Sequence, residues 1–321
     1  MKILLARPRG FCAGVERAIK CVERALELYG APVYVLNDIV HNAHVVNELR
    51  EKGAVFVKRL EDVPKGSHLL FSAHGVSPSR WEDARERQLE VIDATCPLVA
   101  KVHNEARRFA DKDYTIILIG EPGHDETIGT MGWAPEHIRR VFTIEEVEQV
   151  EVPNPEKVAY ITQTTLSVDD CARVIQALTK RFPNIAGPRS GDICYATQNR
   201  QAAVNALSSQ VDLVLVVGDR ASANSTRLAE ICSAQGIPAY LISSAKMIEE
   251  AWLDGVGSIL LTSGASAPER LVESLVTRLR SLGVDRVQSL DGVRENMTFP
   301  LPKGLAPGAA DANDAADAQF G

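Results

Sequence analysis

Three cysteines occupy the same kind of position along the chain, namely Cys12, Cys96 and Cys194. Each follows a short apolar run or a glycine-containing turn, and each opens a segment with helical periodicity. The N-terminus of a helix favours negative charge, so a thiol there is well placed to become a thiolate, the form that binds metals. Three such thiols at wide intervals predict three similar units that converge on one shared metal centre.

The other three cysteines have a different setting. Cys171 shares a helical face with Val174 and Leu178, and Cys21 and Cys232 also fall on apolar faces of predicted helices. Free cysteine at such positions behaves as a small buried hydrophobe. We therefore expect these three side chains to lie in the core and to take no part in the metal centre.

The residues alone leave two kinds of metal site open. Tight zinc sites and ferredoxin-type clusters usually show C-x-x-C spacings, and the chain has none. Three thiolates from separate units can hold three irons of a cubane cluster, which leaves the fourth iron free to bind substrate as a Lewis acid. A zinc site with three cysteines and an open position fits the same residues.

Histidines and one carboxylate add possible ligands and proton carriers. All seven histidines precede residue 138, and His41, His74 and His124 follow predicted strands, where parallel sheets place their ligand sites. Glu126 lies two residues after His124. A carboxylate beside histidines and near a metal can move protons, although a solvated loop acid is the simpler interpretation.

Four loops are rich in hydroxyl and amide side chains: residues 162–170, 195–200, 220–227 and 262–269. Helix capping explains part of this, since Ser167 with Asp170, and Ser266 with Glu269, are spaced like capping boxes. Thr164 precedes the capping residue Ser167, so helix capping does not explain its presence. Helix N-termini ringed with hydroxyls also bind anions, so these loops are candidates to hold a phosphate or diphosphate without a P-loop motif.

Composition limits the class of protein. The chain has 321 residues, 45% of them hydrophobic, and a formal net charge of −7. This charge does not favour nucleic acid or an anionic membrane as a partner. The N-terminal apolar run is too short for a signal peptide or a spanning helix. We expect a soluble cytoplasmic protein, in which six cysteines are more typical of metal binding, catalysis or the core than of disulfides.

Strand and helix patterns alternate almost throughout, which predicts an α/β fold with mostly parallel sheets. Strands are expected at residues 2–6, 33–36, 55–57, 69–72, 91–93, 116–119, 158–162, 213–217, 239–242 and 258–262. Helices are expected at residues 15–29, 98–110, 168–181, 198–208, 224–235 and 268–282. The cysteines suggest three α/β units at residues 1–96, 97–193 and 194–301, followed by a disordered tail at 302–321.

Eight ordered motifs resemble one enzyme family. They resemble the motifs of the 4-hydroxy-3-methylbut-2-enyl diphosphate reductases, which are the last enzymes of the methylerythritol phosphate route to isoprenoids. In chain order, the motifs are ARPRGFCAGVERAI, VHN, FSAHGVS, DATCPLV, GHDET, TQTTLSVDD, DICYATQNRQ and TSGASAPE. The resemblance extends from about residue 1 to 300. It implies three α/β units around a central [4Fe-4S] cluster bound by Cys12, Cys96 and Cys194.

The resemblance also implies the reaction and its participants. An allylic hydroxyl is removed reductively, with two electrons entering through the cluster, to give isopentenyl and dimethylallyl diphosphate. Glu126 matches the proton-delivering carboxylate, with Thr164 beside it. Other residues match those that surround the diphosphate and form the polar network of the active site in this family. They are His41, His74, His124, Ser222, Asn224 and Ser266. A flavodoxin or ferredoxin is the implied electron donor, and we expect a monomer.

One position departs from the family pattern. The family often has two adjacent serines before the asparagine that matches Asn224. In this chain the first of these positions is Ser222 and the second is Ala223. One side-chain donor to the diphosphate is then missing, so weaker binding is expected. Two alternative functions remain at this point, an iron–sulfur hydro-lyase and a three-cysteine zinc hydrolase, each acting on a phosphorylated small molecule.

Overall fold

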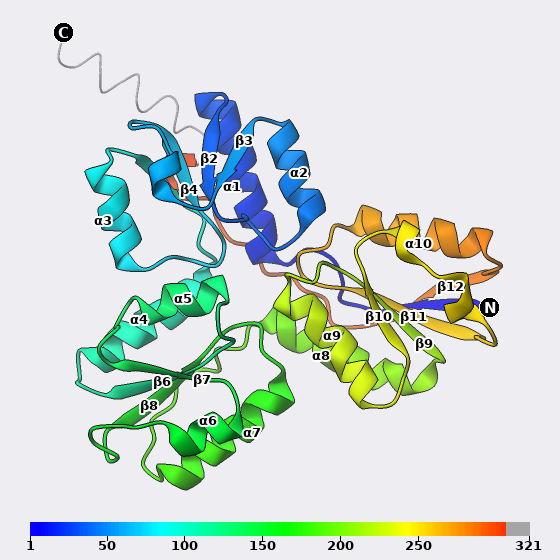
Figure 1. Cartoon of the computed structure of the whole chain (residues 1–321). Helices are drawn as coiled ribbons and strands as arrows, with labels where there is room; N and C mark the ends of the chain where they lie inside the picture. The colour runs from blue at the N-terminus through cyan, green and yellow to red at the C-terminus, as the bar shows by residue number, and fades with distance from the viewer. Residues whose placement is uncertain (306–321) are drawn as a thin grey trace.

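The computed structural model describes residues 1–305 and contains three parallel sheets, each in its own α/β unit (Figure 1). Every strand pair within the three sheets is parallel. The three units meet around a common centre in Figure 1. The predicted α/β class with mostly parallel sheets is therefore confirmed.

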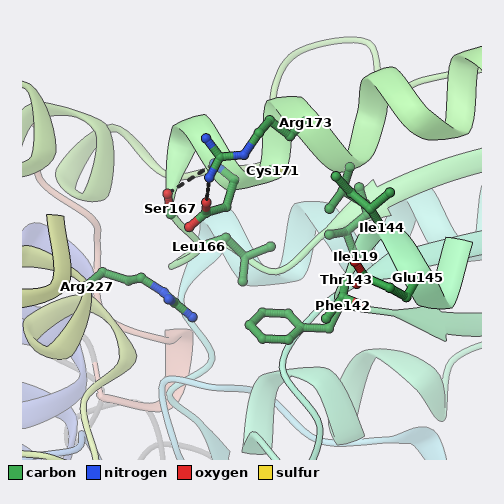
Figure 2. A pocket seen from close by; sticks show the side chains of 12 residues that line it. Ile119, Phe142, Thr143, Ile144, Glu145, Leu166, Ser167, Cys171, Arg173 and Arg227 are labelled. Carbon is green, nitrogen blue, oxygen red and sulfur yellow. Dashed lines mark hydrogen bonds and ion pairs between the residues drawn. The ribbon is translucent and has the colours of Figure 1, made fainter. Parts of the chain in front are cut away.

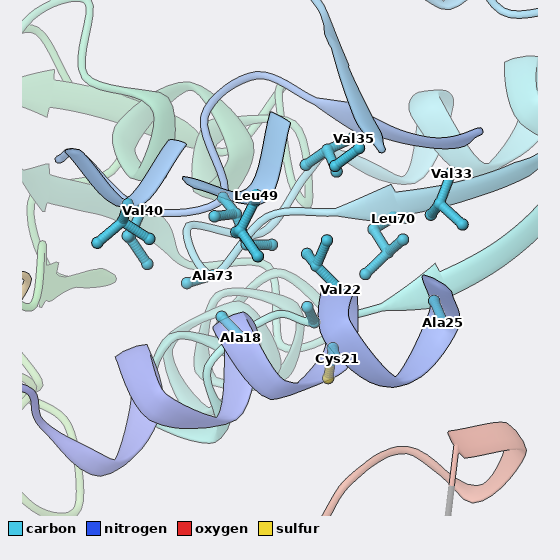
Figure 3. Packing of buried hydrophobic residues seen from close by; sticks show 14 of the residues in the cluster. Ala18, Cys21, Val22, Ala25, Val33, Val35, Val40, Leu49, Leu70 and Ala73 are labelled. Carbon is cyan, nitrogen blue, oxygen red and sulfur yellow. The ribbon is translucent and has the colours of Figure 1, made fainter. Parts of the chain in front are cut away.

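The first sheet has the order β3-β2-β4-β5. Its strands are β2 (Val33–Leu36), β3 (Ala54–Val57), β4 (His68–Phe71) and β5 (Glu90–Asp93), and its helices are α1 (Ala13–Tyr29), α2 (Ala43–Glu51) and α3 (Pro78–Glu86). Figure 3 shows Ala18 and Val22 of α1 on the side toward this sheet, and these two residues and Cys21 are fully buried. The apolar face of α1 thus holds its N-terminus at the end of the sheet, and Cys21 is a core residue as predicted.

The second sheet has the order β7-β6-β8. Its strands are β6 (Thr115–Ile119), β7 (Ile138–Val141) and β8 (Val158–Thr162). The accompanying helices are α4 (Pro97–Ala110), α5 (Asp125–Met131), α6 (Ile144–Gln149) and α7 (Val168–Arg181). Cys171 is 3% exposed and packs in the core of this unit, which confirms its expected role.

The third sheet has the order β10-β9-β11-β1-β12. Its strands are β1 (Lys2–Leu5), β9 (Leu213–Val217), β10 (Ala239–Ile242), β11 (Ser258–Ser263) and β12 (Arg286–Ser289). Its helices are α8 (Tyr195–Leu207), α9 (Ala223–Ala234) and α10 (Glu269–Ser281). Cys232 is fully buried in this unit, again as predicted.

Both ends of the chain depart from the expected division. The first strand, assigned by sequence to a unit at 1–96, pairs with β11 and β12 of the third sheet, with Leu4 opposite Leu260. At the other end, Leu305 closes a short 3-10 turn and is fully buried in the first core, so the expected tail does not begin at residue 302. The rest of that tail, 306–321, lies outside the described residues. The remaining unit boundaries stay a prediction.

Within residues 1–305, none of the helices combines the length and the apolar character that crossing a membrane requires.

Candidate active site

Five helices begin at residues that line one cavity, which we call the central pocket. Cys12, Cys96, His124, Cys194 and Ser222 are the residues at the starts of α1, α4, α5, α8 and α9. Helix N-termini carry partial positive charge and free N–H groups, so this arrangement suits anionic ligands. The expectation that three cysteines open three helices and converge is confirmed.

All twelve residues singled out from the sequence line this one pocket. They are Cys12, His41, His74, Cys96, His124, Glu126, Thr164, Cys194, Ser222, Ala223, Asn224 and Ser266. They come from all three units, so no single unit contains the pocket. Their roles remain predictions, but their convergence is a property of the fold.

Gly14 creates the space in which two of the cysteines meet. A Cβ atom at Gly14 would lie 2.7 Å from Sγ of Cys96 and 3.9 Å from Sγ of Cys12. Real Cβ atoms do not approach other atoms as closely as the first distance. A side chain at this position would therefore displace Cys96, and the glycine is needed for the thiols to face a common space.

Burial works against ionisation of these thiols in the protein without metal. It raises the pKa of Cys96 to about 12 and of Cys194 to about 11, and it also raises the pKa of Cys12. Backbone N–H groups at the helix starts lower these pKa values, but by less. The helix N-termini favour the thiolate form, as expected, but desolvation outweighs this contribution. A metal bound by these cysteines would have to displace the protons.

Glu126 lies beside Thr164 at the floor of the pocket and is 2% exposed. The Thr164 backbone N–H donates to Oε1 at 2.6 Å and the Thr164 hydroxyl donates to Oε2 at 2.9 Å. Burial raises the pKa of Glu126 to about 7, although both hydrogen bonds lower it. Glu126 can therefore hold a proton near neutral pH, which an exposed glutamate cannot.

The acid is tied to one of the thiol loops. The Cys194 backbone N–H donates to the Thr164 carbonyl at 3.0 Å. On the other side, Nδ1 of His124 accepts a hydrogen bond from the Glu126 backbone N–H at 3.1 Å. Since Nδ1 is an acceptor, the neutral His124 ring carries its proton on Nε2 and is a donor there.

The three predicted histidines form a cluster. The rings of His41 and His74 stack with centroids 4.0 Å apart, and the His124 ring is edge-on to His41 at 5.3 Å. Burial lowers the pKa of all three, to about 4 for His124 and well below the usual value for His74. The rings are therefore neutral at pH 7 without ligand, and each offers a polar N–H group.

Hydroxyl and amide groups also line the pocket, next to the histidines. Ser266 donates to the His41 carbonyl at 3.1 Å and lies 3.4 Å from the Ser222 hydroxyl. Asn224 is 4% exposed, and both its side-chain oxygen and nitrogen lack a hydrogen-bond partner among the described residues. A buried amide without partners costs free energy, so this side chain is a candidate to bind a ligand in the pocket.

The capping interpretation holds for one serine and fails for the other. Ser167 accepts from the Asp170 N–H at 3.2 Å and begins α7, as the sequence predicts. The residue that begins α10 is Pro268, not Ser266, and it forms no side-chain cap. Ser266 is thereby free to face the pocket, and the capping box expected at this position is wrong.

Several residues of the site were missed from the sequence. Thr197, one turn into α8, contacts Sγ of Cys194 through its hydroxyl at 3.2 Å and its N–H at 3.4 Å. Gln163 is 1% exposed and accepts from the Glu121 N–H at 2.8 Å, which fixes the start of the loop before α5. The signal for Gln163 was its place between hydroxyl residues directly after a buried strand.

A second cavity lies between the second unit and α9, and we call it the lateral pocket (Figure 2). It is lined by Ile119, Phe142, Thr143, Ile144, Glu145, Leu166, Ser167, Asp170, Cys171, Arg173, Val174 and Arg227. In Figure 2, a dashed line joins Arg173 to a neighbouring carboxylate, which is that of Asp170, while the Ser167 hydroxyl accepts a hydrogen bond from the Asp170 backbone N–H. Arg227 pairs with Glu121 at 2.8 Å and with Glu230 at 2.5 Å, although its Nε has no partner among the described residues. Arg173 and Asp170 therefore partner each other, and Arg227 is partnered through both terminal nitrogens.

Comparisons with known proteins agree on one family. A model described as LytB protein matches residues 3–280. The 4-hydroxy-3-methylbut-2-enyl diphosphate reductase of Azoarcus sp. strain BH72 is 54% identical over 304 residues, which cover 95% of this chain and 97% of that protein. The enzyme of the same name from Acidothermus cellulolyticus is 54% identical over 305 residues, covering 95% and 90% of the two chains.

A solved structure extends the similarity to the fold. It is described as the E-1-hydroxy-2-methyl-but-2-enyl-4-diphosphate reductase from Plasmodium falciparum, and it matches with a TM-score of 0.92 and 40% identity over 99% of each chain. The family model and the curated relatives both cover most of the sequence. The chain therefore belongs to the LytB family.

Proposed function

We propose that this protein is an iron–sulfur oxidoreductase that converts (E)-4-hydroxy-3-methylbut-2-enyl diphosphate to isopentenyl and dimethylallyl diphosphate. The reaction breaks the allylic carbon–oxygen bond, consumes two electrons and two protons, and releases the hydroxyl oxygen as water. Relatives that are 54% identical over 95% of the chain carry the name of this reductase.

One observation carries the proposal most strongly. A single pocket combines three thiols, a carboxyl group with a pKa of about 7, and a buried amide without a partner among the described residues. Redox chemistry, proton delivery and anion binding each require one of these groups. Their presence in one cavity supports a reaction that needs all three.

The donor set fits a cluster better than a single zinc ion. Sulfur atoms that share one tetrahedral zinc ion, at Zn–S distances of about 2.3 Å, must lie within about 4 Å of each other. Among the described residues, the sulfur atoms of Cys12, Cys96 and Cys194 do not lie close enough together to share one ion. Three separated thiols suit a cubane, in which each cysteine binds a different iron.

Cys12, Cys96 and Cys194 would hold this [4Fe-4S] cluster, with Gly14 leaving room for it. When bound, the cluster would supply electrons and one iron without a protein thiolate, which serves as a Lewis acid for the substrate hydroxyl. Thr197 would keep its hydrogen bond to the Cys194 sulfur. Such hydrogen bonds tune the reduction potential of iron–sulfur centres.

The other end of the pocket would hold the diphosphate. Asn224 and the N-terminus of α9 face the pocket, with Ser222 and Ser266 beside them. Neutral His41, His74 and His124 can donate N–H groups to phosphate oxygens. Anion binding next to these rings favours their charged forms, so the complex would take up protons.

Glu126 would deliver the proton that leaves with the hydroxyl group. Its carboxyl can pass a proton to the Thr164 hydroxyl, 2.9 Å away, which in turn donates to the departing oxygen. Burial keeps this acid protonated in a useful fraction of molecules at neutral pH. A flavodoxin or ferredoxin, both small carriers of single electrons, is the proposed reductant.

The proposal is tested by anaerobic reconstitution with iron and sulfide, followed by an assay with the allylic diphosphate and a strong one-electron reductant. We expect a brown protein that binds about four irons and forms both diphosphate products only when reductant is present. Turnover without reductant would instead identify an iron–sulfur hydro-lyase. A colourless active protein containing zinc would identify the hydrolase.

A further inference from the structure

The segment that follows β12 connects the third unit to the first. Residues 290–302 form no helix or strand, and the chain then ends its described part at Leu305, which is buried in the first core. In Figure 1 this segment is coloured orange to red and runs from the third sheet to the unit that contains α1.

A buried arginine anchors the start of this crossing. Arg200 is fully buried, and its Nη1 donates to both carboxylate oxygens of Glu295, at 3.1 and 3.2 Å. The same guanidinium donates to the carbonyls of Gly10 at 2.7 Å and Ala196 at 2.9 Å. Gly10 lies two positions before Cys12, and Arg200 belongs to α8, the helix that Cys194 begins, so Arg200 joins the Cys12 loop and this helix to the crossing segment.

A second arginine anchors the other end. Nε of Arg17 donates to the Pro300 carbonyl at 2.8 Å, and its Nη1 donates to the Thr95 carbonyl at 3.0 Å. Thr95 directly precedes Cys96. The two arginines therefore link the crossing segment to the loops of Cys12 and Cys96 and to the helix that Cys194 begins.

Between these anchors, one apolar side chain turns inward. Phe299 is half-buried and lines the central pocket together with the three cysteines. Met297 and Val293 in the same segment are 45% and 58% exposed. The segment thus presents a single large apolar group to the pocket.

We propose that residues 295–300, which we call the C-terminal strap, close the cysteine side of the central pocket, with Phe299 as the shield and Arg200 and Arg17 as positioning residues. The strap excludes water and chelators from the metal that the cysteines hold. This inference rests on the proposed cluster. It assigns to the strap a protective role that is separate from turnover.

The experiment measures iron release from the reconstituted full chain to a ferrous-iron chelator under anaerobic conditions. We expect Phe299→Ala to release iron about tenfold faster than the wild type, because it removes a large, half-buried apolar group from the pocket. Phe299→Leu keeps apolar bulk and should release iron at nearly the wild-type rate. Met297→Ala is the matched control, since it shortens an exposed side chain of the same strap.

The outcomes separate the strap from general loosening. Equal rates for Phe299→Ala and the wild type would overturn the proposal, as would an equal acceleration in Met297→Ala. A wild type that binds no iron before the chelator is added would contradict the proposed function instead.

The same assay tests the anchors. Glu295→Ala removes the carboxylate that Arg200 binds and should accelerate iron release. Unchanged iron release from this variant would show that Arg200 and Glu295 do not hold the strap.

Discussion

The central and lateral pockets contain similar residue types but differ in how these are partnered. Each includes a cysteine, a glutamate and a serine at a helix start. In the lateral pocket, Ser167 caps α7 and Arg173 pairs with Asp170, so these groups satisfy one another. In the central pocket, the Asn224 amide has no partner among the described residues, and the thiols lie where a ligand can reach them.

This contrast shows that composition alone does not mark a functional site. Protein interiors satisfy their polar groups, and groups that stay unsatisfied cost stability. An unpartnered amide beside three convergent thiols is therefore a better sign of ligand binding than a cavity lined by paired charges. Five predictions test whether the contrast is functional.

The largest expected effect comes from the thiols. Cys96→Ser should lower the iron content after reconstitution and reduce activity by more than about 100-fold, because loss of a ligand is at least as costly as loss of its supporting partners. Cys171→Ser in the lateral pocket is the control. It should lower the free energy of unfolding by about 1–3 kcal/mol through a buried hydroxyl, with full iron content. Full iron content in Cys96→Ser would contradict the assignment.

Glu126→Gln should reduce kcat by about 10²–10⁴-fold, because it removes the proton donor, while iron content is retained. Glu145→Gln is the matched change in the lateral pocket. Glu145 is exposed, and a hydrogen bond to its own backbone N–H lowers its pKa, so it holds no proton at neutral pH. Anaerobic kinetics should find Glu145→Gln fully active. Equal activity of the two variants would remove Glu126 from the mechanism.

The same carboxyl sets a pH dependence. Glu126 donates its proton in the protonated form, which predominates below its pKa of about 7. The kcat/KM value should therefore be level below this pH and fall by about tenfold per unit above it. Residual activity of Glu126→Gln should lack this fall.

Asn224→Ala should raise KM for the diphosphate by about 10- to 100-fold, since a hydrogen bond to a charged group contributes about 1.5–3 kcal/mol. Ser167→Ala in the lateral pocket removes a helix cap. It should cost about 1 kcal/mol of folding stability without changing KM. Thermal unfolding and steady-state kinetics measured on both variants distinguish binding from stability.

The smallest expected effect is an increase in affinity for the substrate. Ala223→Ser adds a hydroxyl at the start of α9, next to the proposed diphosphate site. One hydrogen bond of about 0.5–1.5 kcal/mol should lower KM by roughly 2- to 10-fold. An unchanged or higher KM would mean that the backbone N–H already serves this position.

Sequence patterns predicted the elements with strong apolar periodicity. The helices that contain Cys21, Cys171 and Cys232 were recognised because these residues share an apolar face, and all three are buried in the structure. The positions of Cys12, Cys96 and Cys194 at helix starts also followed from local patterns. These inferences needed only neighbouring residues.

Elements without such patterns were missed. Helix α5 buries Glu126, Thr127, Gly129 and Thr130, so it lacks an apolar face and was interpreted as a loop. Strand β12 is largely exposed at the edge of its sheet. The pairing of β1 with the third sheet depends on residues more than 250 positions away, which no local pattern can reveal.

That pairing has a consequence for biosynthesis. Lys2 and its neighbours are synthesised before their partners in β11 and β12, which begin at Ser258 and Arg286. At a synthesis rate of about 5–20 residues per second, the first strand waits roughly 15–50 s for them. Cys12 begins the helix that follows this strand. Delivery of the proposed cluster would therefore have to wait until β11 and β12 are synthesised, and a chain truncated before β11 would leave Cys12 behind an unpaired strand.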